Sequence, residues 1–246
     1  MGDIYENSKS NAEKFIIIYN ELDRYMRTCL NEDERIGHTD LIKRMAKRSK
    51  LFLKNKDDLM LFARLRNSIV HNPYNSELDP IAEPHDKIIK RYKEIRDSLL
   101  NPPTALSTIA VKGKNIYSIT LEEYVFDVMN VMKENNYTHV PVIDKDNMML
   151  GVFSESTVFA YMVKNEYISI NRKTKIKEFE EFIPIQKHEN EFFPFVPEGT
   201  LTVEIEEMFQ RKLQGKKRLA VIYITETGKV KEKILGLITA WDVAAK

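Results

Sequence analysis

The chain has 246 residues, of which 43% are hydrophobic and 30% are charged, and its formal net charge is +1, as in an ordinary globular protein of about two domains. Cys29 is the single cysteine, which excludes an internal disulfide and a cysteine-based metal cluster and fits a reducing cytoplasm, and the 8 glycines form no phosphate-loop or dinucleotide fingerprint. The apolar run Phe15–Tyr19 is too short for a signal peptide or a membrane span, so we expect a cytoplasmic protein that binds no membrane.

The first segment with helical periodicity lies near the start of the sequence. Between Asn11 and Leu30 the apolar residues follow a spacing of four, three and four, which predicts one helix with one buried stripe: Phe15, Tyr19, Leu22 and Met26. A second helix is expected to begin with Thr39 or Asp40 as its cap, a third at Asp57–Asp58, and a last one at Pro84. Their buried faces are expected to carry Leu41, Ile42, Met45 and Leu51, then Leu61, Leu65 and Ile69, then Ile88, Ile89, Tyr92 and Ile95.

The ends of these helices follow from proline. Asn72–Pro73 ends the third helix, because a residue before proline avoids helical geometry, and Asn101–Pro103 marks the boundary to the next domain. The sequence therefore predicts an all-α helical bundle over residues 1–100.

Residues 41–72 are strongly basic, with nine cations and two anions, a local charge of +7. Such a segment can attract a phosphate backbone. It can equally be the solvated face of a helix, because Lys and Arg are good helix formers.

The basic segment ends in Leu65-Arg-Asn-Ser-Ile-Val-His-Asn72. Arg66, Asn67 and His71 in this order resemble the signature of HEPN (higher eukaryotes and prokaryotes nucleotide-binding) domains, an all-α family that includes metal-independent ribonucleases. The resemblance covers about residues 10–100. It implies that the motifs of two protomers line one cleft, in which His71 acts on the 2′-hydroxyl or the leaving 5′-oxygen of an RNA. It also implies that Arg66 stabilises the scissile phosphate and that Asn67 orients the histidine or the phosphate. The alternative is that Arg66 and His71 only fix the third helix to its neighbours.

A repeat dominates the rest of the chain. Tyr137–Asp144 followed by Gly151–Ala160 reads as strand, turn, strand and helix, and Lys217–Ile224 followed by Gly236–Lys246 reads the same way about 85 residues later. One such unit cannot bury its apolar face alone, so two copies are expected to pack on each other.

The repeat resembles a tandem pair of cystathionine-β-synthase (CBS) domains over about residues 101–246, with a first copy at about 101–165 and a second at about 180–246. The family pattern is a glycine, two apolar residues, Thr or Ser, two variable positions, and Asp. The second copy matches it with Gly236, Leu237, Ile238, Thr239 and Asp242. The resemblance implies an α+β protein in which the helical bundle precedes two β-α-β-β-α modules that pack as a pseudo-symmetric pair and bind an adenosine-containing ligand.

The residues of the second copy suit such a ligand. Thr239 can cap the following helix or meet a phosphate, and Asp242 can accept hydrogen bonds from both hydroxyls of a ribose. Further ligand contacts are expected from residues that can sandwich a purine or reach phosphates: Leu219, Ala220 and Ile238, then Arg218 and Thr200. The alternative is that Thr239 only caps the helix and Asp242 only stabilises its first turn.

The first copy differs at the last position of the pattern. It has Gly151, Val152, Phe153 and Ser154, but Thr157 stands where the family has Asp. The loss of a charged hydrogen bond costs roughly 1.5–3 kcal/mol, so we expect this site to be empty. His139 is then expected to be a packing residue, and His38, His85 and His188, which have no partner spacing, are expected in loops.

Two functions are open at this point. One is a ribonuclease controlled by an adenine nucleotide (ATP, ADP, AMP or S-adenosylmethionine) and the other is a non-catalytic sensor or adaptor in which the nucleotide governs dimerisation or partner docking. Both imply a homodimer without a metal, and the first implies RNA as a partner. DNA binding by a helix-turn-helix is a third possibility, but the basic region lacks the compact glycine turn.

Overall fold

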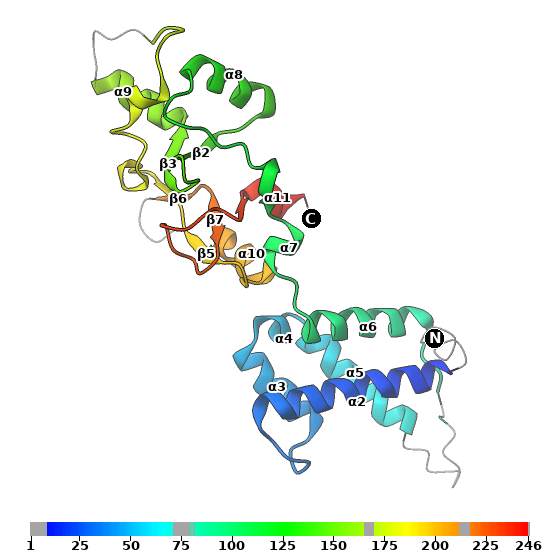
Figure 1. Ribbon diagram of the computed structural model, residues 1–246. Coiled ribbons are helices and arrows are strands. Elements are labelled where there is room, and N and C mark those ends of the chain that lie inside the picture. Colours follow the sequence, from blue (N-terminus) through cyan, green and yellow to red (C-terminus); the bar gives the residue numbers. More distant parts are fainter. Residues whose placement is uncertain (1–8, 71–79, 81, 165–169, 212–216, 246) are drawn as a thin grey trace. The chain divides into compact units, whose positions relative to one another are not determined.

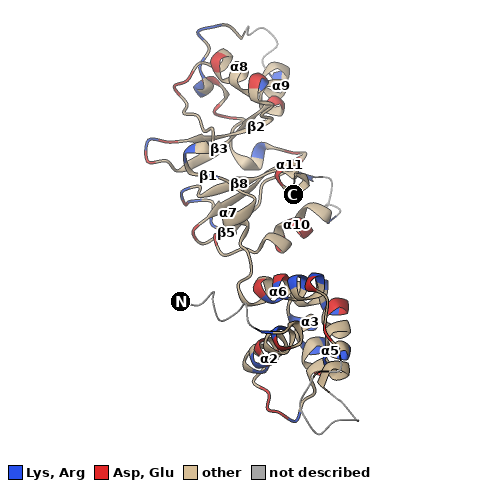
Figure 2. Cartoon of the chain, turned by 90° about the vertical axis from the view of Figure 1, so that its right-hand side faces the viewer, with Lys and Arg blue, Asp and Glu red and all other residues tan. Residues whose placement is uncertain are grey.

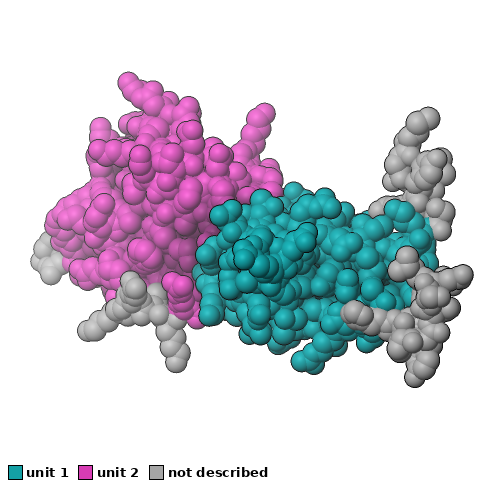
Figure 3. Space-filling model, turned by 90° about the horizontal axis from the view of Figure 1, so that it is seen from below, with its two compact units in different colours: residues 1–103 teal, residues 104–246 magenta. Residues whose placement is uncertain are grey.

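A computed structural model describes residues 9–70, 80, 82–164, 170–211 and 217–245. The chain divides into two compact units, residues Met1–Pro103 and Thr104–Lys246, which are coloured separately in Figure 3. The first unit is helical and the second combines helices with short strands, so the class is α+β (Figure 1). No helix in the described ranges combines the length and apolarity that crossing a bilayer requires.

The helices described in the first unit are α2 (Asn11–Leu30), α3 (His38–Arg48), α4 (Lys50–Lys54), α5 (Lys56–Val70) and α6 (Asp86–Leu100). The first one has the predicted bounds, and it begins where the Ser10 hydroxyl accepts from the Glu13 amide while the Glu13 carboxylate accepts from the Ser10 amide. Phe15, Leu22 and Met26 are buried as expected. Helices α2, α3, α5 and α6 share one apolar core.

Several expected details of this unit are wrong. Helix α3 is preceded by Gly37 rather than by a cap at Thr39 or Asp40, and Leu51 lies in a separate helix because the backbone is extended at Ser49 (φ −129°, ψ 125°). Leu61 is 56% exposed, since α5 turns other apolar side chains inward: Leu59, Phe62, Ala63 and Ile69. Helix α6 begins at Asp86, two residues after Pro84. The predicted stop at Asn72–Pro73 lies outside the described residues.

The cations of residues 41–70 are mostly exposed. In Figure 2, the positions of Lys and Arg (blue) and of Asp and Glu (red) are interspersed along the helices of this unit. Part of the positive charge is paired, since Lys43 Nζ lies 2.9 Å from Asp40 Oδ1. This is the pattern of a solvated helix face.

The second unit begins with α7 (Ala105–Thr108), β1 (Val111–Lys112) and the 3-10 turn η1 (Gly113–Asn115). Its first half then contains α8 (Val125–Asn135), β2 (His139–Ile143), β3 (Met149–Ser154), α9 (Glu155–Lys164) and the 3-10 turns η2 (Ile176–Phe179) and η3 (Ile185–Lys187). Its second half contains β4 (Glu191–Phe192), β5 (Phe195–Pro197), α10 (Thr202–Gln210), β6 (Arg218–Leu219), β7 (Ile222–Thr225), β8 (Gly236–Ile238) and α11 (Ala240–Ala244).

The two halves repeat one topology. In the second half, β5 pairs in parallel with β7 across α10, and β7 pairs with β8 in an antiparallel hairpin that leads into α11. In the first half, Ile119 bridges in parallel to Val142 across α8, and β2 pairs with β3 in a hairpin that leads into α9. The predicted β-α-β-β-α pair is therefore confirmed. Each half has its own core, and a third cluster of Met149, Val152, Phe193, Val221 and Tyr223 joins them.

Both repeat glycines lie where another segment crosses the hairpin. A Cβ at Gly151 would stand 2.0 Å from the Ile183 carbonyl oxygen, and this carbonyl accepts a hydrogen bond from the Val152 amide at 2.9 Å. A Cβ at Gly236 would stand 3.0 Å from Leu106 and 3.1 Å from Ala110. The missing side chain thus lets the crossing segment close each half.

Candidate functional site

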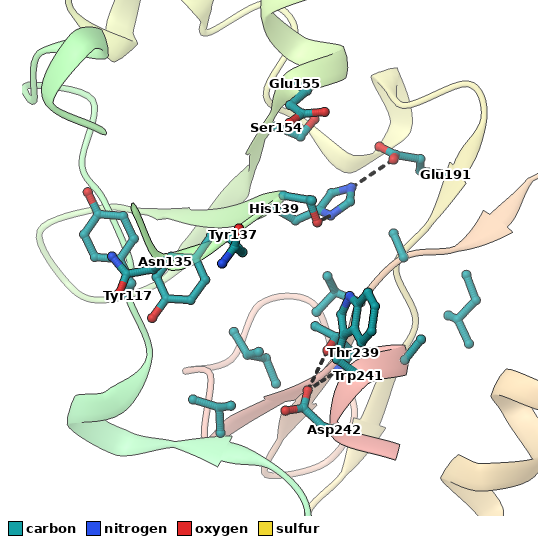
Figure 4. A pocket seen from close by; sticks show the side chains of 18 of the residues that line it. Tyr117, Asn135, Tyr137, His139, Ser154, Glu155, Glu191, Thr239, Trp241 and Asp242 are labelled. Atoms are coloured by element: carbon teal, nitrogen blue, oxygen red, sulfur yellow. Dashed lines mark hydrogen bonds and ion pairs between the residues drawn. The ribbon is translucent and has the colours of Figure 1, made fainter. Parts of the chain in front are cut away.

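A cleft of about 1370 Å³ lies between the two halves of the second unit. Its walls come from the segment after β1, the end of α8, the strand β2, the start of α9, the strand β6 and the start of α11 (Figure 4). Aromatic side chains line it on both sides: Tyr117, Tyr137, Phe159 and Trp241. The volume is ample for a nucleoside or a nucleotide.

The end of β8 forms one wall of the cleft. The Asp242 carboxylate accepts from the Thr239 backbone amide and from the Thr239 hydroxyl, both at Oδ2 and both at 2.7 Å (Figure 4). Both residues line the cleft and are half-buried. Within the described residues, Oδ1 of Asp242 accepts no hydrogen bond. One carboxylate oxygen therefore organises the strand-to-helix turn and the other is available to a ligand.

The corresponding turn of the first half is closed on itself. Thr157 Oγ1 accepts from the Ser154 amide at 3.1 Å and lies 3.2 Å from Ser154 Oγ, and Thr157 is only 2% exposed. The hydroxyl reproduces the bond to the turn that Asp242 makes through Oδ2. It supplies no second oxygen and no charge for a ribose.

Of the other residues expected to contact the ligand, some line the cleft and some do not. Arg218, Leu219 and Ala220 line the cleft. Ile238 does not, since it is fully buried in the core of the second half, and Leu237 faces the cleft in its place. Thr200 is absent from the lining of the cleft, and its carbonyl accepts from the Ala105 amide at 2.9 Å.

Glu191 was not identified from the sequence. This residue of β4 is 5% exposed and lines the cleft. Its carboxylate accepts from His139 Nε2 at 2.9 Å, His188 Nδ1 at 3.3 Å, an Arg218 guanidinium nitrogen at 2.8 Å and Ser156 Oγ at 3.1 Å. The hydrogen bond from His139, followed by that from His188, holds the pKa of Glu191 far below its usual range.

The expectation about His38 is wrong, because His38 is the first residue of α3 rather than a loop residue. His188 lies in the loop after η3, as expected, but it is buried at 5% exposure. His139 packs at the strand edge against Phe193, as expected, and it also holds Glu191. His188 is three residues from Glu191 along the chain, but the rest of the cluster has no local signal, because Glu191 lies 52, 35 and 27 residues from His139, Ser156 and Arg218.

In the helical unit, Arg66 and Asn67 lie on α5, and His71 lies outside the described residues. The Arg66 guanidinium is 5.2 Å from the centre of the Tyr19 ring and makes no hydrogen bond to any residue that the structure describes. Asn67 is exposed. The contact with Tyr19 of α2 agrees with a role in fixing α5, but it leaves the donors of Arg66 without a polar partner in the described part of the unit.

Tyr19 in turn stacks on His38, with ring centres 3.9 Å apart. His38 Nδ1 lies 2.7 Å from Asp23 Oδ1, and its Nε2 is buried without a partner among the described residues. Burial lowers the pKa of His38, and the hydrogen bond to Asp23 opposes this effect. These side chains form a support beneath Arg66. No group of three His, Cys, Asp or Glu suited to a metal ion occurs within the described ranges.

The chain was compared with known protein families and known proteins. Residues 110–164 match the model of the family described as CBS domain. No curated protein matches the chain.

Three solved structures are among those similar to the chain. A CBS domain protein from Streptococcus pneumoniae TIGR4 is 16% identical, with a TM-score of 0.43, over 63% of this chain and 88% of that one. CBSX2 in complex with AMP is 18% identical, with a TM-score of 0.41, over 58% and 94%. CbpB in complex with c-di-AMP is 17% identical, with a TM-score of 0.42, over 65% and 91%.

Proposed function

We propose that the cleft of the second unit binds an adenosine-containing ligand and that this unit is a regulatory nucleotide sensor. The observation that carries the proposal is the Asp242 carboxylate, which lines the cleft and fixes its own turn through Oδ2, while Oδ1 accepts no hydrogen bond from a described residue. A carboxylate oxygen of this kind suits the two adjacent hydroxyls of a ribose.

The rest of the wall supports the same ligand. Leu219, Ala220 and Leu237 are half-buried apolar side chains on the cleft and suit the face of a purine. Arg218 projects into the cleft with a 71% exposed side chain and suits a phosphate. In the first half, the closed turn at Thr157 supports an empty ribose position.

A thermal-shift panel tests this proposal. Adenosine, AMP, ADP, ATP and S-adenosylmethionine are added to the wild type and to Asp242→Ala, and at least one of them is expected to raise the melting temperature of the wild type, because a ligand that binds only the folded state stabilises it by mass action. The same ligand should raise the melting temperature of Asp242→Ala far less. A wild type that no adenine compound stabilises contradicts the proposal.

We further propose that the ligand controls a metal-independent ribonuclease in the helical unit. Support comes from Arg66, whose donors have no polar partner in the described residues and whose guanidinium rests on Tyr19, and from the exposed cations of residues 41–70. Control requires that the ligand bind two states of the chain with different affinity.

Cleavage of labelled RNA by the pure protein, with and without the stabilising ligand and in the presence of a chelator, tests this second proposal. Arg66→Ala and His71→Ala are expected to abolish cleavage, while Arg64→Ala, an exposed arginine on the same helix, is expected to retain it. Cleavage that survives both substitutions contradicts a ribonuclease at this motif. RNA binding without cleavage by the wild type favours the alternative, a non-catalytic adaptor.

A homodimer is part of both functions. Large apolar side chains are exposed on α9 and α11: Phe159, Met162, Val163 and Trp241. Exposed apolar side chains of this number suit a protein interface. Sedimentation at micromolar concentration is expected to show a dimer, and a strict monomer contradicts this part of the proposal.

A further inference from the structure

The Glu191 cluster joins the two halves at the wall of the cleft. One buried carboxylate holds His139 of β2 and Ser156 of α9 from the first half, Arg218 of β6 from the second half, and His188 from the segment between them. The Arg218 side chain is 71% exposed, while the carboxylate it contacts is 5% exposed. The side chains of His139 and His188 are 9% and 2% exposed, so Arg218 is the exposed one of these three nitrogen donors. An anion in the cleft would therefore meet the cluster at Arg218.

Each ring nitrogen of His188 lies beside a hydrogen-bond acceptor. Its Nδ1 lies 3.3 Å from Glu191 Oε2 and its Nε2 lies 3.2 Å from the Val152 carbonyl oxygen. Both partners only accept hydrogen bonds, so both ring nitrogens can donate only when the imidazole carries two protons. His139 differs, because its Nδ1 lies 2.8 Å from the Thr138 hydroxyl, which can donate, and a neutral ring satisfies both of its contacts.

Other charged groups lie beside the cluster. Lys217 Nζ donates to the His188 carbonyl at 3.0 Å, and Glu155 and Asp242 line the cleft. Among the described residues, one nitrogen of the Arg218 guanidinium is engaged, by Glu191, and Arg218 itself lines the cleft.

We propose that Glu191 is a positioning residue that holds Arg218 for an anionic group of the ligand and links this contact to the second proton of His188. This inference rests on the proposed binding of an adenosine compound in the cleft. A negative charge beside Arg218 weakens the hold of that arginine on Glu191 and adds negative charge near the imidazoles, and both effects favour the protonated ring.

The sign of the linkage follows. Because the anion favours the proton, the proton favours the anion by the same factor. Affinity for an anionic ligand is therefore expected to fall as the pH rises and His188 loses its second proton. Adenosine, which lacks the anionic group, is expected to bind without this dependence.

Calorimetric titrations with adenosine and adenosine 5′-sulfate between pH 5.5 and pH 8 test the inference. The sulfate keeps a single negative charge throughout, so ionisation of a phosphate does not contribute. The ratio of the Kd of adenosine to the Kd of the sulfate is expected to fall by at least about fivefold from the lowest to the highest pH, the low end of typical couplings. A ratio that stays constant overturns the inference.

Variants separate positioning from simple support of the fold. Glu191→Gln and His188→Gln are expected to make the ratio independent of pH. Glu155→Gln, which removes an exposed carboxylate from the same cleft, is expected to keep the pH dependence. The inference is overturned if Glu191→Gln keeps the slope of the wild type.

One measurement needs no variant. Titration of the wild type in two buffers of different ionisation enthalpy counts the protons bound with the ligand, and the expected result is proton uptake with the sulfate and none with adenosine. Absence of uptake with the sulfate overturns the inference even if the variants fail to fold. If neither compound binds at any pH, the proposed adenosine site itself fails, which is a different outcome.

Discussion

Substitution of Asp242 by asparagine separates ligand binding from helix capping. In the wild type, Asp242 lines the cleft, its Oδ2 accepts both hydrogen bonds from Thr239, at 2.7 Å each, and its Oδ1 accepts none from a described residue. An amide side chain has one oxygen, so Asp242→Asn can serve the turn or the ribose but not both, and it has no charge.

The magnitude follows from the kind of bond that is lost. A hydrogen bond to a charged group contributes about 1.5–3 kcal/mol, which corresponds to about one to two powers of ten in Kd. If the amide oxygen keeps the turn, the ligand loses this contribution. If the amide oxygen turns to the ligand instead, the helix loses a cap worth about 1 kcal/mol.

Calorimetric Kd values for adenosine and urea unfolding of the ligand-free protein measure the two effects. Glu204→Gln is the matched control, because the Glu204 carboxylate accepts from the Leu201 amide at 3.0 Å at the start of α10 and lies outside the lining of the cleft. We expect Glu204→Gln to lower stability slightly and leave the Kd unchanged. An Asp242→Asn protein with the Kd of the wild type, or a Glu204→Gln protein with an equal loss of affinity, refutes the reasoning.

Three further outcomes follow from the structure. Gly151→Ala should lower the free energy of unfolding by about 1–3 kcal/mol, because a Cβ there would lie 2.0 Å from the Ile183 carbonyl oxygen, and an unchanged urea midpoint would contradict this. The hydrogen bond from His139 is the main cause of the lowered pKa of Glu191, so on acidification the carboxyl is protonated in the unfolded state before it is protonated in the folded state. As the pH falls below about 4.3, the wild type should therefore lose more of its free energy of unfolding than Glu191→Gln does. Parallel acid-unfolding curves of the two proteins would contradict this expectation. Phe159→Asp should shift the sedimenting species from dimer to monomer. Because this side chain is 70% exposed, the substitution should not lower the melting temperature of the ligand-free monomer. A dimer of unchanged affinity would show that the interface lies elsewhere.

Local patterns determined most of the architecture. The stripe of α2 follows a helical period over 20 residues, and the two strand–turn–strand–helix patterns differ enough from helical spacing to be separated from it. The turn at Thr239 and Asp242 is also local, since both bonds join residues three apart. Such features depend on neighbours in the chain, and the sequence contains those neighbours in order.

Which face of an element is buried was less certain. Helix α5 has apolar residues on more than one side, so the period allowed a face with Leu61 and the packing against α2 and α3 selected another. In β8 the side chains alternate, and the sequence does not state that Leu237, rather than Ile238, points to the cleft. The partner surface makes that choice.

The Glu191 cluster was decided by tertiary structure alone. Its members come from β2, α9, β4, β6 and the segment after η3, and of the partners of Glu191 only His188, three residues away, is near it along the chain. A buried carboxylate is stable only where several donors converge on it, and that convergence exists only after the two halves have packed. The sequence therefore determined the two halves and the turn that faces a ribose, while their packing determined the charged wall between them.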